Sequence, residues 1–296
     1  MNDPVSVGGL PESGKKSRQD PGMFVGREGE VERLREAIER RTGLAIWGPA
    51  DAGKTALVRH VLARLPRAMA RSCVYRRVEG PPHALLCGML EQLYERGDGF
   101  LKAKFRGETG RGAEFGRWAE EQSSLRMRGL LYRAGQEGGY SFFLDDVNGF
   151  SDAFVRIVKE LSEMRGCPVY LLARGHTERE VGRAARLYWN DELRLSVGPL
   201  GPAAARRLLE HCIRRYGLTR LNLDGFREGV LRFSGRLPGA IVEMCARAAE
   251  PQYQFGDRIE TRLLHVDYMM QFSFRGERAA RAAASAGDRA VQDAGK

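Results

Sequence analysis

The segment at residues 48–55, GPADAGKT, constrains this chain more than any other feature, because it fits the pattern G-x-x-x-x-G-K-[ST]. It follows a short apolar run, Leu44 to Trp47, and opens a stretch from about Lys54 to Leu65 whose apolar residues have helical spacing. A strand, a glycine-rich loop and a helix in this order bring backbone N–H groups and the positive end of the helix onto a phosphate group. The sequence therefore predicts a nucleotide-binding loop within an α/β fold.

Two side chains of this loop have expected chemical tasks. Lys54 would neutralise the β- and γ-phosphate oxygens, and Thr55 would offer its hydroxyl to Mg²⁺, which prefers hard oxygen ligands. The residues of the loop that we expect to bind the nucleotide are Gly48, Pro49, Ala50, Asp51, Ala52, Gly53, Lys54, Thr55 and Ala56.

A carboxylate on the metal side of the site is expected at the end of a neighbouring buried strand. The apolar run Tyr140 to Leu144 is followed by Asp145 and Asp146. We assign Asp145 to the Mg²⁺ shell, through water, and Asp146 to orienting or deprotonating the attacking water, so that Asp146 and Lys54 are catalytic candidates. The alternative is a strand that ends in an Asp-Asp turn. Asp152, in the loop that follows, is expected to cap a helix.

A third buried strand is predicted at Pro168 to Ala173, and it ends at Arg174. If this strand lies beside the one that carries the two aspartates, its guanidinium is close to both and can sense the γ-phosphate. The alternative is a solvated loop arginine, with no role in the site.

Apolar runs alternate with amphipathic stretches as far as residue 197, a pattern typical of βα units and a parallel sheet. Five strands are predicted, near residues 44–47, 73–78, 140–144, 168–173 and 193–197, and helices alone after Gly198. The expected organisation is a flexible leader (1–22), a P-loop α/β core (23–199), a small all-helical lid domain (200–275) and a flexible tail (276–296).

Composition sets wider limits. The chain has 296 residues, 43% of them apolar, which excludes disorder throughout, and five cysteines without a CxxC pair, which excludes a zinc ribbon. No run approaches the roughly 18 apolar residues of a membrane span, so we expect a cytoplasmic protein with no membrane partner. The net charge of +10 comes from 41 Arg and 7 Lys. Arginine clusters make DNA a conceivable partner, although interleaved acidic residues also fit solvated helix faces.

Several segments together resemble the AAA+ ATPases and their signal-transduction relatives, the STAND NTPases. They are Phe24-Val25-Gly26-Arg27-Glu28, GPADAGKT, FFLDD, the strand that ends in Arg174, and Ser234-Gly235-Arg236-Leu237-Pro238. The similarity covers about residues 24 to 250. It implies ATP as the nucleotide, and a parallel five-stranded sheet with a helical lid. It also implies Val25, Gly26 and Arg27 as neighbours of the base or ribose, and Pro238 and Arg236 as lid residues near the nucleotide.

The same resemblance implies a site completed by an arginine from a second subunit. Arg183 and Arg186, in the helix before the fifth strand, are the candidates, and a solvated helix face is the alternative for each. The Asp145-Asp146 pair departs from the Asp-Glu of AAA+ motors and is more familiar among STAND proteins, where turnover is often slow.

These features favour a slow, Mg²⁺-dependent ATPase that acts as a nucleotide-controlled switch, regulating assembly or the binding of a separately encoded effector. The expected partners are ATP or ADP and further copies of the chain or that effector. One alternative is a DNA-binding AAA+ regulator of transposition or replication initiation that assembles on DNA with ATP. Another, a kinase acting on a small molecule, is disfavoured by the acid pair at the strand end and by the helical segment that contains SGRLP.

Overall fold

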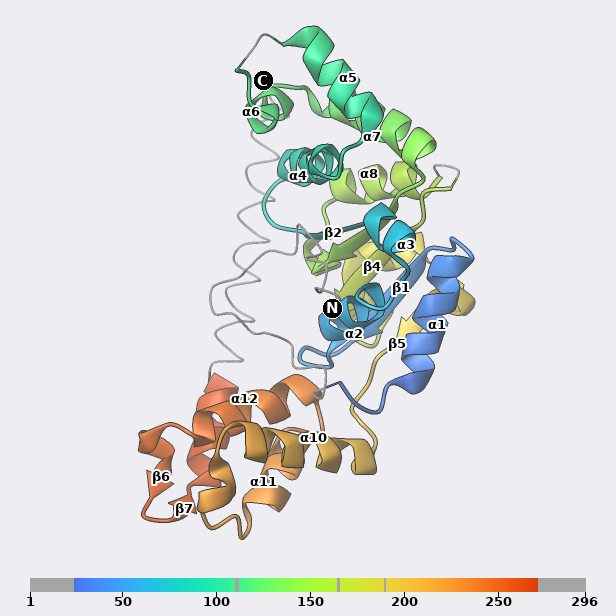
Figure 1. The fold of residues 1–296 in the computed structure, drawn as a ribbon. Coiled ribbons are helices and arrows are strands. Elements are labelled where there is room, and N and C mark those ends of the chain that lie inside the picture. Colours follow the sequence, from blue (N-terminus) through green and yellow to red (C-terminus); the bar gives the residue numbers. More distant parts are fainter. Residues whose placement is uncertain (1–23, 110–111, 164–165, 189, 271–296) are drawn as a thin grey trace.

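A five-stranded parallel sheet forms the centre of the computed structural model, which describes residues 24–109, 112–163, 166–188 and 190–270 (Figure 1). The strand order is β2-β3-β4-β1-β5. The strands are β1 (Leu44–Gly48), β2 (Cys73–Arg77), β3 (Ser141–Asp145), β4 (Val169–Arg174) and β5 (Arg194–Ser196). The fold class expected from the sequence, a P-loop α/β core with a parallel five-stranded sheet, is confirmed. The leader and the tail that we expected at 1–22 and 276–296 lie outside the described residues.

Helices cover both faces of the sheet because successive residues of each strand point to opposite sides. Phe142 packs in one core, among α4 to α8, whereas Phe143 packs in the other, against α1 and α2. The central strands are therefore apolar throughout, as strands buried on both faces should be. The helices of this part are α1 (Glu28–Glu39), α2 (Lys54–Leu62), α3 (Arg67–Ser72), α4 (Pro82–Glu95), α5 (Gly99–Glu108), α6 (Phe115–Glu120), α7 (Ser124–Gly138), α8 (Asp152–Glu163) and α9 (Glu178–Val181).

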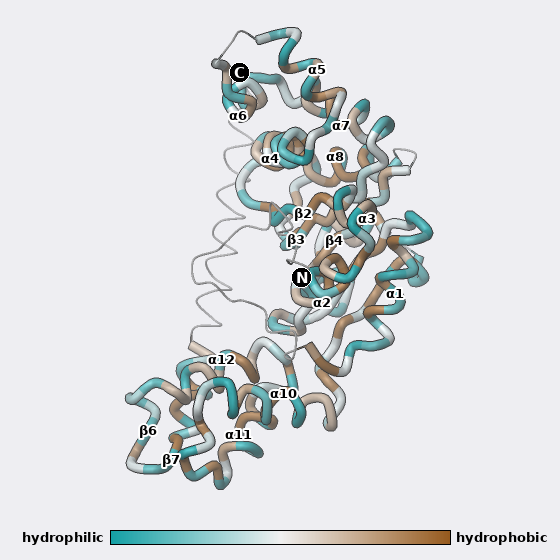
Figure 2. Tube along the Cα trace, viewed as in Figure 1, coloured by the Kyte–Doolittle hydropathy of each residue, from teal (hydrophilic) through white to brown (hydrophobic). Residues whose placement is uncertain are grey.

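The amphipathic pattern of α8 shows how sequence dictates these contacts. Phe154, Ile157, Val158 and Leu161 are spaced three and four apart and are all buried. This face of α8 lies toward the sheet and is brown in Figure 2. The described residues also form short 3₁₀ helices: η2 (Val147–Gly149), η3 (Gly182–Leu187), η4 (Asp191–Leu193), η5 (Leu218–Arg220) and η6 (Pro251–Tyr253).

The chain after Gly198 builds a separate core, which we call the helical part. It comprises α10 (Pro202–Arg215), α11 (Phe226–Phe233), α12 (Pro238–Ala248) and a helical stretch at 261–270. Figure 1 shows α10, α11 and α12 packed together at one end of the molecule, away from α4 to α7. One detail of the expectation was wrong, because this part is not all helical. Two short strands, β6 (Gln254–Phe255) and β7 (Arg258–Ile259), pair as a hairpin around Gly256, whose φ is +65°.

Phe143 gives a test of the packed sheet. It is fully buried in β3 and its ring stacks on Tyr170 of β4, with 4.3 Å between ring centroids. We expect Phe143→Ala to lower the free energy of unfolding by about 3 to 5 kcal/mol, through lost burial and the cavity that remains. Tyr132→Ala on the exposed face of α7 is the control and should change it by less than about 1 kcal/mol. Urea unfolding measures both, and equal effects would contradict this description of the core.

Candidate functional site

The loop between β1 and α2 has the backbone shape that a phosphate cradle needs. Gly53 precedes α2 with a φ of +88°, a left-handed conformation that glycine adopts readily. A Cβ added to Gly48 would lie 2.0 Å from the carbonyl oxygen of Val197, so only glycine fits there. These two glycines explain the motif locally: one lets the loop turn into the helix, and the other lets β1 pass close to the segment after β5.

Lys54 is held inside this loop. Its Nζ donates to the carbonyl oxygens of Gly48 and Pro49, each at 2.8 Å, and its side chain is 8% exposed. Burial lowers the pKa of Lys54 to about 8, while the nearby carboxylate of Asp145 acts in the opposite direction. Among the described residues, the hydrogen-bond partners of this buried ammonium are neutral carbonyls, and a bound phosphate would place negative charge directly against it.

Thr55 and Asp145 are joined by a hydrogen bond, although they are 90 residues apart in the chain. Thr55 Oγ1 donates to Asp145 Oδ2 at 2.6 Å, and the Tyr75 hydroxyl donates to the same oxygen. The backbone N–H of Asp146 donates to the other oxygen of Asp145, at 2.8 Å. Burial, reinforced by the Asp145 charge, raises the pKa of Tyr75, which keeps this hydroxyl protonated and able to donate. The Asp145 carboxylate is thus fixed beside the Thr55 hydroxyl.

Asp146 lies beside Arg174, as expected for neighbouring strands, since β3 pairs with β4. One Nη of Arg174 donates to both carboxylate oxygens of Asp146, at 2.6 and 2.7 Å. Arg77, at the end of β2, donates to Asp146 Oδ2 at 3.2 Å. Asn148 fixes the backbone of Arg174, accepting from its N–H at 2.6 Å and donating to its carbonyl at 2.5 Å. Asp146 is therefore a carboxylate paired with two guanidinium groups.

The helical part contacts the phosphate loop directly. The N–H of Gly239, in the first turn of α12, donates to the Asp51 carbonyl at 2.9 Å. Pro238 begins α12, and its Cγ would lie 3.3 Å from a Cβ added to Gly53. Arg236 has a φ of +62° and an exposed side chain, for which the described residues provide no ion-pair partner. Pro238 and Arg236 thus lie next to the loop, and their contact with a nucleotide stays a prediction.

The segment before α1 joins the two parts of the molecule. Val25 packs on the core of the helical part, and a Cβ on Gly26 would lie 2.3 Å from the Cβ of Ala204 in α10. Arg27 is buried, and its guanidinium donates to Glu30, to the carbonyl of Ala52 at 3.1 Å and to that of Gly198. Its role beside the base or ribose stays a prediction. The contacts show that it ties the loop to the connection after β5.

Arg183 and Arg186 lie on the 3₁₀ helix η3, and neither makes a hydrogen bond to Asp146 among the described residues. Both are exposed, and Arg183 Nε lies 3.4 Å from a carboxylate oxygen of Asp152. Their action on a second subunit stays a prediction. The expectation that Asp152 caps a helix was wrong, because Asp152 is the first residue of α8 and the Ser151 hydroxyl accepts from the Phe154 N–H at 3.4 Å.

The residues present fit MgATP. The loop offers a buried cation and a helix N-terminus to the phosphates, and Thr55 and Asp145 form a pair of oxygen donors of the kind that Mg²⁺ prefers. The described residues contain no cluster of three or more His, Cys, Asp or Glu side chains that would hold a metal without the nucleotide.

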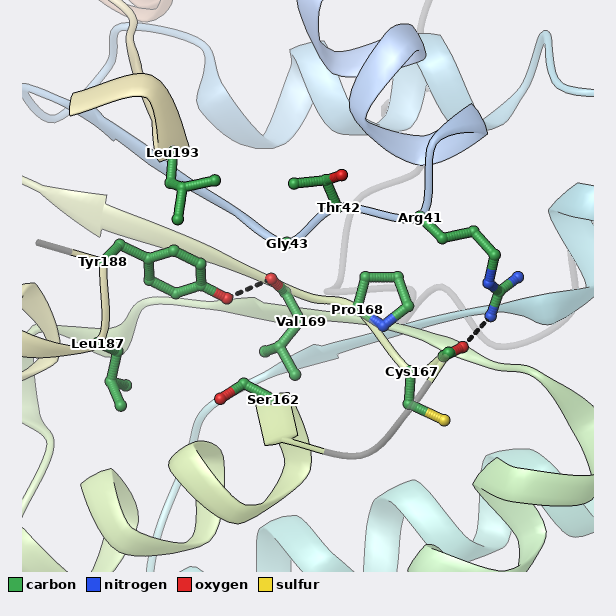
Figure 3. Close-up of a pocket in the computed structure, with 11 residues that line it drawn as sticks. Arg41, Thr42, Gly43, Ser162, Cys167, Pro168, Val169, Leu187, Tyr188 and Leu193 are labelled. Carbon is green, nitrogen blue, oxygen red and sulfur yellow. Dashed lines mark hydrogen bonds between the residues drawn. The ribbon is translucent and has the colours of Figure 1, made fainter. Parts of the chain in front are cut away.

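A hollow of about 330 Å³ lies at the other edge of the sheet and shares no residue with the loop. It is lined by Gly43 before β1 and by Val169 at the start of β4, and Figure 3 shows the Tyr188 hydroxyl directed at the Val169 carbonyl oxygen. The hollow lies where β1 and β4 begin, whereas the two aspartates lie where β3 ends, so the hollow is not part of the candidate site.

Sequence reasoning missed three polar residues of the site: Tyr75, Arg77 and Asn148. Tyr75 and Arg77 lie on β2 on either side of Arg76, and Asn148 follows the aspartates by two residues. The only available signal was that β2 would end at the same edge as β3, which places Arg77 opposite Asp145 in the register.

Fold and loop together define a P-loop NTPase. Residues 23–172 match the family of AAA ATPase domains, and the chain belongs to that family. The expected membership of the AAA ATPase group is thereby confirmed.

Among solved structures the chain is similar to a STAND protein with a tetratricopeptide repeat sensor from Pyrococcus horikoshii. The identity is 17% and the TM-score 0.49, over 83% of this chain and 32% of that one, so the chain spans about a third of that protein's length. No curated protein matches the chain. In the part of the chain that the structure describes, every helix is too short or too polar to cross a membrane.

The lowered pKa of Lys54 predicts how ATP binding depends on pH. The unbound lysine loses its proton as the pH rises through about 8, so ATP should bind progressively more weakly above that pH, by up to about tenfold per pH unit. Lys54→Arg keeps its charge in this range, so whatever its affinity, that affinity should stay nearly constant. Isothermal titration between about pH 7 and about pH 9.5 measures both. A flat profile for the wild type would contradict the assignment.

Proposed function

We propose that this protein is an ATP-binding, Mg²⁺-dependent ATPase that acts as a nucleotide-controlled switch. The observation that carries the proposal is the contact between the phosphate loop and the first turn of α12, through Gly239 and the Asp51 carbonyl. A nucleotide held by the loop lies where the α/β core and the helical part meet. Its arrival or hydrolysis would change the relation between the two, and with it assembly or partner binding.

The residues of the site divide the chemical work. Gly53 and the start of α2 bind phosphate oxygens, and Lys54 neutralises their charge. Thr55 and Asp145 would hold Mg²⁺, and the metal would supply positive charge that offsets the charge developing on the phosphate during transfer. Asp146 orients or deprotonates the attacking water, and Arg174 stabilises the γ-phosphate.

The pairing of Asp146 supports slow turnover. The Asp146 carboxylate oxygens accept hydrogen bonds from Arg174 and Arg77, so they are already engaged by two side chains and not free to accept a proton from water. To serve as a base toward water, Asp146 has to be released from at least one of them, and a γ-phosphate that attracts Arg174 would do this. Such a site suits a switch that spends long periods in one nucleotide state better than a motor.

The partners follow from the same proposal. They are ATP and ADP, and either a second copy of the chain or a separately encoded effector, with the exposed Arg183 or Arg186 completing a neighbouring site. All five cysteines are free and buried, which supports a reducing compartment, the cytoplasm.

One observation favours the alternative of a DNA-binding regulator. The solvent side of α10 exposes the arginines Arg206, Arg207, Arg214 and Arg215. Binding of double-stranded DNA that weakens steeply with salt, together with assembly and faster hydrolysis on DNA, would favour this function. Turnover that DNA does not change, with assembly controlled by the nucleotide alone, would favour the switch.

Two substitutions separate binding from hydrolysis. Lys54→Ala should abolish ATP binding, because it removes the only cation inside the loop. Asp146→Ala should preserve binding and abolish hydrolysis, because the carboxylate acts on water and not on the phosphates. Nucleotide binding by titration and phosphate release measure the two effects.

Matched controls for these variants are Lys159→Ala and Asp224→Ala, which remove exposed charges far from the loop. Both should behave like the wild type. A Lys54→Ala protein that still binds ATP normally would contradict the assignment of the site.

A further inference from the structure

Asp51 is the one residue of the phosphate loop whose backbone and side chain both bond to the helical part, among the residues described. Its carbonyl accepts from Gly239 N–H at 2.9 Å, and its Oδ2 accepts from the Tyr268 hydroxyl at 2.7 Å. Tyr268 lies 217 residues further along the chain, in the helical stretch 261–270. A Cβ on Gly239 would lie 2.8 Å from the Cβ of Asp51, so the two segments are in close contact.

The backbone conformation of Asp51 explains why its side-chain hydrogen bond matters. Its φ is +60°, a left-handed conformation that disfavours residues with a Cβ and that glycine adopts without cost. Aspartate tolerates the conformation when its carboxylate has local or tertiary hydrogen bonds. The hydrogen bond from Tyr268 is such a stabilising bond, and it explains why an acidic residue occupies this position.

The negative charge of Asp51 also bears on phosphate binding. Its carboxylate belongs to the phosphate loop itself, three residues before Lys54, so it would repel phosphate groups bound by that lysine. The Tyr268 hydroxyl holds the carboxylate toward the helical part. A carboxylate released from this bond could turn toward the phosphates and weaken their binding.

Tyr268 is well placed to transmit such a change. Its side chain is 8% exposed, and its helical stretch is anchored in the helical part by the buried Leu264 and by the bond from the Tyr253 hydroxyl to Asp267, at 2.7 Å. The stretch 261–270 is therefore anchored in the core of the helical part through Leu264 and contacts the phosphate loop through Tyr268.

We propose that Tyr268 is a positioning residue that holds the Asp51 carboxylate away from the phosphate site and couples the stretch 261–270 to nucleotide binding. This inference rests on the proposed nucleotide site. It assigns the coupling between the core and the stretch 261–270 to one hydroxyl group, whereas the hydrogen bond from α12 to the loop is made by the backbone of Gly239.

Tyr268→Phe removes that hydroxyl and keeps the ring. Tyr253→Phe is the matched control, because it removes a similar tyrosine–aspartate bond from the same helical stretch without touching the loop. We expect Tyr268→Phe to raise the Kd for ATP about fivefold, which corresponds to the free energy of one hydrogen bond. Tyr253→Phe should change the Kd by less than about twofold. In an Asp51→Asn background, where the repelling charge is absent, Tyr268→Phe should have little further effect on the Kd.

Hydrogen exchange gives a readout besides affinity. In the wild type and in Tyr253→Phe, saturating ATP should slow the exchange of the amides in 261–270. In Tyr268→Phe at saturating ATP, that protection should be lost while protection of the loop at 48–55 persists.

The outcomes separate this inference from the proposed function. If the wild type binds ATP and Tyr268→Phe matches it in Kd and in protection of 261–270, this inference is wrong and the proposed function stands. If the wild type binds no nucleotide, both are wrong. If Tyr253→Phe loses affinity and protection as strongly as Tyr268→Phe, the effect comes from general loosening of the helical part, and the role of Tyr268 as a positioning residue is wrong.

Discussion

The parallel pairing of β1, β4 and β3 brings the ends of three strands to one edge of the sheet, because parallel strands all point the same way. Gly48, Arg174 and Asp145 end these strands, and each leads directly into a residue or loop of the site. The hydrogen bond from Thr55 to Asp145 closes this edge by joining the phosphate loop to β3. A shift of one residue in the register of β3 would turn Asp145 to the opposite face of the sheet and break that bond.

The helical part depends on the same edge. Several of its contacts with the core are made to the phosphate loop: Gly239 bonds to the Asp51 carbonyl, Tyr268 bonds to the Asp51 carboxylate, and Pro238 packs near Gly53. Most of these contacts involve backbone atoms of the loop. Any change in loop conformation on nucleotide binding would therefore be transmitted to α12, and this transmission is the physical basis of the proposed switch.

Much of the fold followed from the sequence because its signals are local. The loop lies between an apolar run and an amphipathic helix, and the strands buried on both faces are continuously apolar, so β3 and β4 were placed to within a residue or two. The hairpin of β6 and β7 was not foreseen, because two-residue strands have no periodicity to detect. Ser151 and Asp152 are adjacent and both suited to cap α8, so composition could not choose between them.

The candidate site was predictable only where a motif spans consecutive residues. Lys54, Thr55 and Asp145 fell into recognisable segments, and the structure brings them together. Tyr75 and Tyr268 had no such signal, because their importance comes from tertiary contacts with Asp145 and Asp51 over 70 and 217 residues. Arginine is so frequent in this chain that Arg77 could not be distinguished from its exposed neighbours until the register of β2 against β3 was known.

A crystal structure of the protein with Mg²⁺ and a non-hydrolysable ATP analogue tests the central claim most directly. The account predicts the triphosphate over the loop at 48–55, with Lys54 on its β- and γ-oxygens and the metal beside Thr55 and Asp145. It also predicts that α12 contacts the nucleotide through Pro238 or Arg236. A nucleotide bound elsewhere, or a triphosphate on the loop with the metal remote from Asp145, would contradict it.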